Sequence, residues 1–382
     1  MDADVLVIGA GIAGLTTAAR LLAQGLRVTV MERAEGLQAA GAGIMLHPNA
    51  LAHLDHLGPE LYATGTGIAR QVTTDPDGTA TTLDWAAVWG GPRLPLAVQR
   101  IRLAELMLRH LPEGTVRWST EPVALHQRPD HVEVEFAGGR RHERYGVVIG
   151  ADGVNSWVRR QYVDPAAEPR YLGHVYWRTT VPSQAPFDFT DWRIWRAGGH
   201  FFGGMPIGGG RHHVFLQADL DRPVRVPADR AHPELVALAA EMGPRVGALV
   251  AALDPADSYN VRPALGLSVQ RWTADRIALL GDAAHSFSPA TTQGGAMAVE
   301  DSAVLAEELA RSGVGPRALA DYEARRLPRV RDFTRLARLH GVLSSSIQHG
   351  PALAAAPGAA PRPAPSPTAW FRRLYRPLMD AA

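Results

Sequence analysis

The chain has 382 residues, of which 46% are hydrophobic and 20% charged, and its formal net charge is +1. This composition is typical of a soluble globular protein that is long enough for one large domain or two merged ones. The sequence contains no cysteine and no lysine. Disulfides, thiolate metal sites, a cysteinyl nucleophile and a lysine Schiff base are therefore excluded.

Charge and hydropathy indicate where the protein is located and which classes of partner it binds. No apolar run approaches the roughly 20 residues that cross a membrane, and the acidic start Met1–Asp4 is not typical of a signal peptide. A near-zero charge, without a basic stripe carrying interleaved aromatic residues, gives no reason to expect nucleic acid as a partner. We therefore expect a cytoplasmic protein with no membrane span and no metal site.

The first predicted elements are a strand, a glycine loop and a helix. Val5–Ile8 form a short apolar run typical of a strand buried on both faces. Gly9, Gly11 and Gly14 follow in G-x-G-x-x-G spacing, and a helix is predicted over Ile12–Gln24. Gly9 allows the tight turn, Gly11 lets a pyrophosphate approach the backbone, and Gly14 lets the helix pack closely on the strand. The loop alone suits NAD as well as FAD.

A second parallel strand is predicted at Arg27–Glu32. Glu32 stands eighteen residues after Gly14 (14 to 32), close to the roughly 20 that usually precede an acid binding the adenosine ribose. An exposed glutamate that merely ends a strand is the alternative.

The middle of the chain alternates between helix and strand patterns. Strand-like pieces occupy residues 71–98, and helical periodicity returns over Arg100–Leu111. Alternating residues at His131–Phe136 predict a hairpin or meander. Gly146–Gly150 is another fully apolar strand, and it leads into Ala151–Gly153.

Aromatic residues become dense between Tyr171 and Leu220, where alternating patterns are separated by glycine turns. We expect an antiparallel sheet that forms a second layer or domain. Its aromatic side chains could simply pack as a core, or together they could form the wall of a pocket for a flat apolar ligand.

The C-terminal third begins with another apolar strand, Arg276–Asp282, which again ends in Gly-Asp. Helical stretches are predicted over Ala283–Ala310 and Pro316–Leu343, followed by an Ala/Pro-rich linker at Gly350–Pro367. The basic and aromatic segment Trp370–Met379 is expected to pack back onto the body, with a membrane surface as the alternative.

Three apolar strands thus end in small loops that suit phosphates: GAGIAG from Gly9, GADG from Gly150 and GDAAH from Gly281. In this order they resemble the single-component FAD-dependent aromatic hydroxylases of the para-hydroxybenzoate hydroxylase fold, the class A flavoprotein monooxygenases, as far as about Gly341. The resemblance implies an α/β fold, with a Rossmann-type FAD-binding domain interleaved with a mixed or antiparallel substrate sheet and followed by C-terminal helices.

The predicted division of the chain follows from that resemblance. FAD-binding parts are expected at 1–70 and 99–170, with a third part and the C-terminal helices at 271–345. Substrate-domain segments are expected at 71–98 and 171–270, and a Pro/Ala-rich tail at 346–382. We expect a monomer or a homodimer.

The resemblance also implies which residues hold a resident, non-covalent FAD. The glycine loop would hold the pyrophosphate, Glu32 the ribose and Asp282 the ribityl chain, while NAD(P)H would visit transiently and share the Asp152 motif. As plain alternatives, both aspartates could be helix caps or turn acids. The predicted cofactor-binding set is Gly9, Gly11, Ile12, Ala13, Gly14, Glu32, Arg33, Gly43, Arg100, Val123, Asp152, Asp282, Gln293, Gly294 and Gly295.

Several of these residues have implied roles at particular parts of the cofactor. Arg33 would lie along the adenosine, Arg100 would reach the FAD from its helix, and the backbone of Val123 would meet the adenine. The Gln293–Gly295 turn would begin a helix that points at the isoalloxazine, where free N–H groups stabilise negative charge. The family often has an asparagine where this chain has Ala296, so one polar contact is lost and the flavin potential could differ.

The implied reaction is oxygen insertion. NAD(P)H would reduce FAD, O2 would add to form a C4a-hydroperoxide, and its distal oxygen would pass to an aromatic or polycyclic substrate. Hydroxylation, epoxidation and Baeyer–Villiger insertion all remain open. The candidate catalytic residues are His200, His213, Tyr176 and Pro289, with His212 as a further base, Arg178 or Arg193 as anion clamps and His47 near the flavin. Each alone could instead be structural.

Rival activities differ in how well the sequence fits them. A flavin-dependent halogenase relies on a lysine and a W-x-W-x-I-P signature, whereas this chain has no lysine and Trp192–Trp195 has the wrong spacing. A plain NAD dehydrogenase would leave the GADG and GDAAH loops unused. A flavin oxidoreductase that inserts no oxygen, and a non-catalytic FAD-binding protein, remain open.

Overall fold

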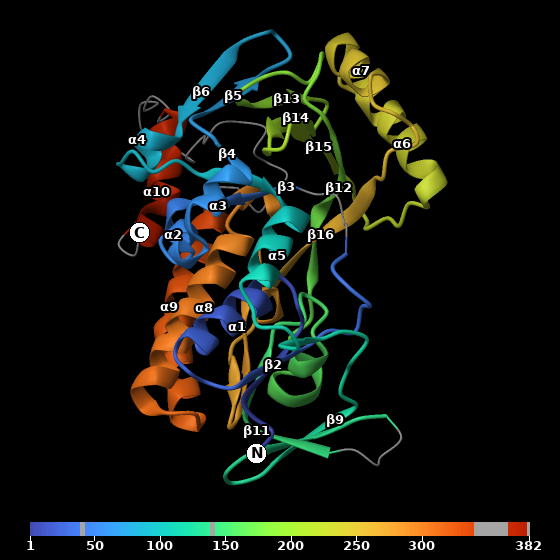
Figure 1. The fold of residues 1–382 in the computed structure, drawn as a ribbon. Coiled ribbons are helices and arrows are strands. Elements are labelled where there is room, and N and C mark those ends of the chain that lie inside the picture. Colours follow the sequence, from blue (N-terminus) through green and yellow to red (C-terminus); the bar gives the residue numbers. More distant parts are fainter. Residues whose placement is uncertain (39–42, 138–141, 340–365, 380–382) are drawn as a thin grey trace, which may run out of the picture.

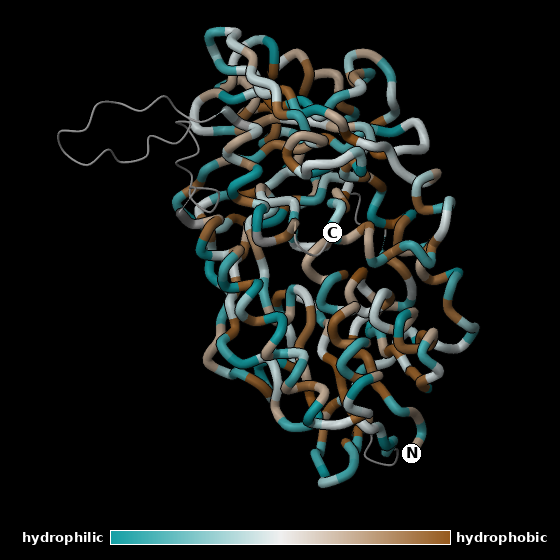
Figure 2. The backbone as a smooth tube through the Cα atoms, turned by 90° about the vertical axis from the view of Figure 1, so that its left-hand side faces the viewer, coloured by the Kyte–Doolittle hydropathy of each residue, from teal (hydrophilic) through white to brown (hydrophobic). Residues whose placement is uncertain are grey.

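Two sheet regions are stacked along the long axis of the molecule, and the N-terminus lies at the far end of the lower one (Figures 1 and 2). The computed structural model describes residues 1–38, 43–137, 142–339 and 366–379. The chain passes between the two regions repeatedly, so each sheet collects strands from distant parts of the sequence. The predicted α/β fold with interleaved sheets and C-terminal helices is confirmed.

The lower sheet contains eight strands. They are β1 (Ala3–Ile8), β2 (Val28–Met31), β8 (Val116–Arg117), β9 (Ala124–Gln127), β10 (Val132–Glu135), β11 (His142–Gly150), β17 (Thr273–Ala274) and β18 (Ile277–Leu279). The main path runs β17–β18–β11–β1–β2–β8, and the hairpin β9–β10 extends from β11. The neighbours β18, β11, β1, β2 and β8 are parallel. Val5–Val7 are fully buried, as expected for parallel strands covered on both faces.

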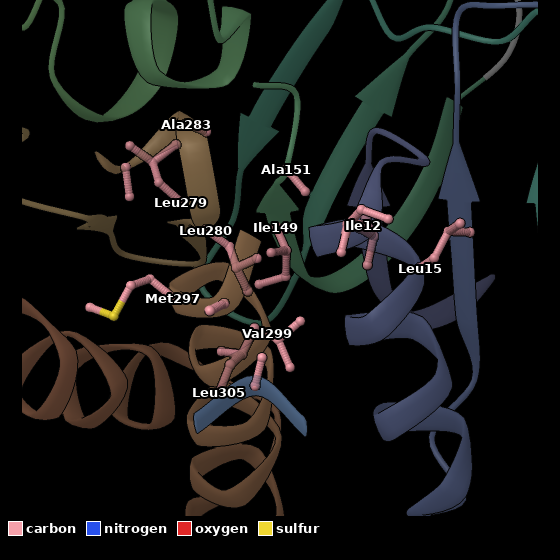
Figure 3. Close-up of a cluster of buried hydrophobic side chains, with 14 of the residues drawn as sticks. Ile12, Leu15, Ile149, Ala151, Leu279, Leu280, Ala283, Met297, Val299 and Leu305 are labelled. Atoms are coloured by element: carbon pink, nitrogen blue, oxygen red, sulfur yellow. The ribbon is translucent and has the colours of Figure 1, made fainter. Parts of the chain in front are cut away.

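Four helices flank this sheet: α1 (Ile12–Ala23), α5 (Arg100–Arg109), α8 (Gly294–Ser312) and α9 (Pro316–Leu339). α1 and α8 lie side by side, and Thr17 Oγ1 donates to Ser302 Oγ at 2.9 Å between them. Figure 3 shows the apolar core beneath the strand ends, where Leu15, Ile149 and Val299 belong to three different elements. This core fixes the helix starts against the edge of the sheet.

The upper sheet also contains eight strands, in the order β19–β16–β12–β15–β14–β13–β5–β6. They are β5 (Arg70–Thr74), β6 (Ala80–Asp84), β12 (Arg170–Pro182), β13 (Trp192–Ala197), β14 (His200–Pro206), β15 (Arg211–Asp219), β16 (Asn260–Ser268) and β19 (His285–Ser286). Every pair is antiparallel except β13–β5. Helices α6 (Ala228–Glu241) and α7 (Pro244–Ala251) cover one face.

Alternation along β12 gives the upper sheet two different faces. Val175 and Trp177 pack into a second apolar core with Leu235 and Val250 of α6 and α7. Tyr176 and Arg178 therefore point to the other face, toward the lower region. The aromatic residues of this stretch thus divide between core and pocket wall.

A third, three-stranded sheet consists of β3 (Gly43–Leu46), β7 (Leu96–Gln99) and β4 (Gly65–Gly67), in the order β3–β7–β4. The remaining elements are α2 (Pro48–Leu51), η1 (Asp55–Leu57), α3 (Gly58–Ala63), α4 (Trp85–Trp89), the π-helical turn η2 (Arg159–Val163), η3 (Gly281–Ala283), η4 (Pro289–Thr291) and α10 (Pro367–Met379).

One predicted helix begins later than expected. The stretch from Ala283 was predicted to be helical, but α8 starts only at Gly294. Gly281 (φ 60°) and Thr292 (φ 51°) adopt left-handed backbone, and Pro289 has no N–H to continue a helix. The intervening residues form two short 3₁₀ turns and the strand β19 instead.

The C-terminal segment packs on the body as expected. α10 lies against α4 and α9, and its Leu374, Tyr375 and Leu378 are fully buried. Most of the predicted Ala/Pro-rich linker lies outside the described residues. Within the described ranges, the structure contains no helix whose length and apolar character would suffice for a bilayer span.

Candidate active site

The glycine loop after β1 leaves no room for side chains at two of its three glycines. Gly9 has φ 110°, and a Cβ there would lie 2.5 Å from the carbonyl oxygen of Ala151. A Cβ at Gly14 would lie 1.9 Å from the carbonyl oxygen of Gly9. A Cβ at Gly11, by contrast, would meet no atom within 4 Å among the described residues other than its chain neighbours. The loop is closed where it packs and open where a pyrophosphate would approach, and it leads into the free N–H groups of α1.

Glu32 is held beside this loop. Its Oε2 accepts from the backbone N–H of Ala10 at 2.9 Å, and its Oε1 accepts from that of Ala34 at 2.9 Å. The carboxylate therefore bridges the glycine loop and the end of β2, where a ribose next to the pyrophosphate would lie. Arg33 follows it and is exposed.

The three loops predicted to bind phosphate meet at one edge of the lower sheet. Ile8 is paired with Gly150, and Gly150 with Leu279, so the carboxyl ends of β1, β11 and β18 are neighbours. A Cβ at Gly281 would lie 3.1 Å from that of Ala298 and 3.2 Å from that of Ala13. This brings the third loop against both α1 and α8.

Asp152 caps the turn that follows β11. Its Oδ2 accepts from the backbone N–H groups of Trp157 at 2.7 Å and Val158 at 3.1 Å. Its buried Oδ1 has no hydrogen-bond partner among the described residues. The capping alternative is thus realised by one oxygen, and the predicted cofactor contact can involve only the other.

Asp282 lies three residues before β19, where the chain passes from the lower region to the upper sheet, and we call the space between these two regions the cleft. Its side chain is exposed to solvent, yet protein surrounds it closely enough that burial raises the pKa of its carboxyl. A group that is both accessible and enclosed faces an internal cleft rather than the outer surface. Its Oδ1 lies 3.9 Å from the position of a Cβ at Gly294, so it faces the first turn of α8.

The start of α8 is shaped by close backbone contacts. A Cβ at Gly295 would lie 2.6 Å from Cδ1 of Ile44 in β3. The first N–H groups of an α-helix have no intrahelical partner, so those of Gly294 and Gly295 are available to a ligand. Thr292, directly before the N-cap Gln293, has φ 51°. Such a conformation costs about 1–3 kcal/mol in a β-branched residue and is frequent at functional sites.

A second group of side chains faces this loop from the upper sheet. Tyr176 donates to Gln217 Oε1 at 2.6 Å, and the Arg178 guanidinium lies 4.5 Å from the centre of the Tyr176 ring. The ring of His213 stacks on Phe215 with centroids 5.9 Å apart. A Cβ at Gly43 would lie 2.8 Å from that of His213, which places β3 and β15 in contact.

Burial sets the protonation of these groups. It raises the pKa of Tyr176 to about 12, so the phenol keeps its proton. Burial, assisted by the nearby charge of Arg178, lowers the pKa of His213 to about 3, so its imidazole is neutral. His174, on the same strand as Tyr176, bonds Ser288 Oγ through Nε2 at 3.1 Å. Pro289 follows Ser288 in the same loop, so it belongs to this group.

Two predicted residues lie apart from the others. His200, at the start of β14, has its Nε2 3.5 Å from Oε2 of Glu241 in α6, on the helix-covered side of the upper sheet. The structure does not bring this candidate together with His213 and Tyr176, because neighbouring residues of a strand point to opposite faces and Phe201 takes the cleft side. Val123 is 48% exposed, and its N–H already donates to Glu135 O at 2.8 Å, so only its carbonyl is free for a ligand.

A buried ionic cluster supports the third loop. The sequence analysis predicted this loop but not the cluster. Asp301 of α8 accepts from His285 Nε2 at 2.6 Å, from Arg326 Nε at 2.7 Å and from the N–H of Gly281 at 3.0 Å. Burial opposes ionisation of Asp301, but the charges of His285 and Arg326 outweigh it and lower its pKa to about 2. The adjacent acids Glu300 and Asp301 in an otherwise apolar stretch of helix were the available signal.

The comparisons identify the class of protein. A family model described as "FAD binding domain" matches residues 2–337, and the chain belongs to that family. A 3-amino-4-hydroxybenzoate 2-monooxygenase of Streptomyces platensis is 35% identical over 88% of this chain and 87% of its own length. An FAD-dependent urate hydroxylase of Klebsiella pneumoniae is 31% identical, over 87% and 88% respectively.

Solved structures agree with these relatives. Klebsiella pneumoniae HpxO, complexed with FAD and uric acid, has a TM-score of 0.80 and 28% identity, covering 99% of this chain and 95% of its own. The predicted family, fold and cofactor are confirmed: the protein is an FAD-dependent monooxygenase. The residues present fit a dinucleotide along the edge of the lower sheet where the three loops meet. The glycine loop is open at Gly11, Glu32 bridges this loop and the end of β2, and Asp282 is accessible.

Proposed function

We propose that the protein uses NAD(P)H and O2 to hydroxylate an aromatic small molecule that carries an acidic group. When bound, FAD would accept electrons from NAD(P)H and activate O2 for transfer of one oxygen atom. The substrate would lie between the first turn of α8 and the face of the upper sheet that carries Tyr176 and Arg178. The residues proposed to hold the FAD remain those of the glycine loop, Glu32, Asp282 and the Gln293–Gly295 turn.

The environment of Arg178 is the observation that supports an acidic group on the substrate. Its guanidinium lies over the Tyr176 ring in the enclosed cleft, and burial lowers its pKa without removing its charge. No described carboxylate lies within ion-pair distance of it. An enclosed cation without a counterion favours an anionic ligand, and guanidinium geometry suits a carboxylate or phenolate. The two relatives named above act on an aminohydroxybenzoate and on urate, which fits this class.

The other side chains of the group position the substrate. The Tyr176 hydroxyl is committed to Gln217, so its ring rather than its proton faces the ligand. His213, neutral and with a pKa of about 3, is too weak a base to hold a proton at neutral pH, and it would accept a hydrogen bond instead. We therefore assign ionisation of the substrate to the field of Arg178, and the flat wall to His213 and Phe215.

The proposal is tested by a panel of matched aromatic compounds. Benzoates and hydroxybenzoates would be compared with their methyl esters for stimulated NAD(P)H consumption, and products would be analysed by mass spectrometry for a gain of one oxygen. We expect the acids to stimulate consumption and to gain oxygen, and the esters to be poor substrates. Equal activity on acids and esters would reject the acidic-substrate proposal, and consumption without any oxygen gain would reject hydroxylation.

A further inference from the structure

The C-terminal helix reaches the loop that precedes α8. Tyr375 of α10 is fully buried, and its hydroxyl donates to the carbonyl oxygen of Thr291 at 2.7 Å. The same hydroxyl lies 3.3 Å from Thr292 Oγ1. A residue more than 80 positions away in the chain therefore holds both residues that precede the N-cap of α8.

His47 holds the same loop from the opposite direction. Its Nε2 lies 2.7 Å from Thr292 Oγ1, and its ring packs between Trp85, Trp89 and Tyr375 at centroid distances of 5.1, 5.5 and 5.2 Å. Its Nδ1 is buried without a hydrogen-bond partner in the described ranges. Burial lowers the pKa of His47 to about 3, so the ring is neutral, and the hydrogen bond that it makes within the described residues goes to Thr292.

These contacts converge on a strained residue. Thr292 has φ 51°, which a β-branched residue adopts only when its surroundings hold it there. Next to it, the side chain of the N-cap Gln293 accepts from Asn49 Nδ2 at 3.2 Å. Because the backbone direction at Thr292 determines where α8 begins, these bonds also fix where its first free N–H groups point.

We infer that His47 and Tyr375 are positioning residues, which clamp Thr292 and Thr291 and thereby aim the N–H groups of Gly294 and Gly295 at the flavin ring. Aimed N–H groups stabilise the negative charge of the reduced flavin relative to the oxidised form. This inference rests on FAD lying against the first turn of α8, and it is independent of the substrate proposed above.

The test measures the reduction potential of bound FAD in the full-length holoenzyme, with no substrate present. Thr292→Val removes the clamped hydroxyl and keeps the side-chain shape, whereas Thr292→Ser keeps the hydroxyl. His47→Phe removes the bond to Thr292, Tyr375→Phe removes the contacts to Thr291 and Thr292, and both variants keep the aromatic packing. We expect Thr292→Val to lose about tenfold in preference for the reduced flavin, a potential lower by about 30 mV for a two-electron couple. The two Phe variants should shift in the same direction.

A matched control separates positioning from plain stability. Tyr145→Phe removes another fully buried hydroxyl, which donates to Glu143 at the opposite end of the lower sheet. It should lower the melting temperature but leave the potential unchanged, and Thr292→Ser should restore the wild-type potential. A variant that loses its flavin would be compared by FAD titration, where we expect weaker binding for Thr292→Val than for Thr292→Ser. Wild-type potentials in all three clamp variants, or equal shifts in Thr292→Ser and Thr292→Val, would overturn the inference.

Discussion

The two sides of the cleft differ in which atoms line them: backbone atoms on one side and side chains on the other. The edge of the lower sheet is shaped by backbone, since a Cβ at Gly14 would lie 1.9 Å from Gly9 O and one at Gly9 would lie 2.5 Å from Ala151 O. The upper sheet presents side chains, among them Tyr176 and Arg178, on strands whose other face packs on helices. Backbone packing tolerates almost no substitution, whereas alternating side chains can change without disturbing the strand. We therefore expect the cofactor side to tolerate few substitutions, and the substrate side to tolerate many.

The largest effect is expected where backbone packing is tightest. Gly14→Ala places a methyl group 1.9 Å from the carbonyl oxygen of Gly9, so α1 must move away from β1. We expect a loss of at least about 3 kcal/mol in unfolding free energy, at the upper end of overpacking costs, together with loss of bound FAD. Chemical denaturation of the apoprotein and visible flavin absorbance would measure both. A stable yellow variant would contradict the close packing described for this loop.

Gly11→Val tests the open position of the same loop. Apart from its chain neighbours, no atom of the described residues lies within 4 Å of a Cβ at Gly11, so the apoprotein should unfold at nearly the wild-type denaturant concentration. The new side chain would occupy the space of the pyrophosphate, and the purified protein should be colourless and inactive. If this variant keeps its flavin, the loop has been assigned to the wrong part of the ligand.

Asp301→Asn tests the ionic support beneath the cleft. Replacing the acid leaves the buried Arg326 without one of its counterions, and removing one partner of a buried pair costs about 3–5 kcal/mol. Glu307→Gln, a half-exposed acid of the same helix paired with Arg325, is the matched control and should cost less than about 1 kcal/mol.

The pH dependence of stability should follow the same residue. The pKa of Asp301 is about 2 in the folded protein, against 3.8 for an unperturbed aspartate. Its contribution of about 2 kcal/mol is complete above the unfolded pKa and is lost as pH falls from about 4 to about 2. Denaturation curves at several pH values should show a steeper acid loss for wild type than for Asp301→Asn, and parallel curves would contradict the low pKa.

A smaller effect is expected on the upper sheet. Arg178→Ala removes the proposed anion contact, and a hydrogen bond to a charged group is worth about 1.5–3 kcal/mol, so KM for an acidic substrate should rise about 10- to 150-fold. Arg193 is the matched control, because it lies on the opposite face over the Phe189 ring, beside Trp195 and Arg245. Steady-state kinetics should leave Arg193→Ala close to wild type. Equal losses in both variants would show that the two sheet faces do not differ as described.

The contrast between the two sides also explains what the sequence could predict. The glycine loop is one short stretch of sequence and Glu32 follows it at a characteristic spacing, so the roles of both follow from rules that hold in any chain of this type. The upper-sheet group depends on pairing register, so periodicity alone could not show that His213 faces the cleft while His200 faces α6. The aromatic C-terminal segment suggested packing, but nothing local indicated that Tyr375 would reach Thr291. The predicted domain boundaries and the individual cofactor contacts stay predictions.

The most direct test of the account is an isotope experiment. The holoenzyme would be supplied with NAD(P)H, labelled O2 and the acidic aromatic compound that best stimulates cofactor consumption, and the product mass would be measured. We expect the wild-type enzyme to form product with one labelled oxygen atom and Gly11→Val to form none. Product that carries no label, formed while NAD(P)H is consumed, would contradict it.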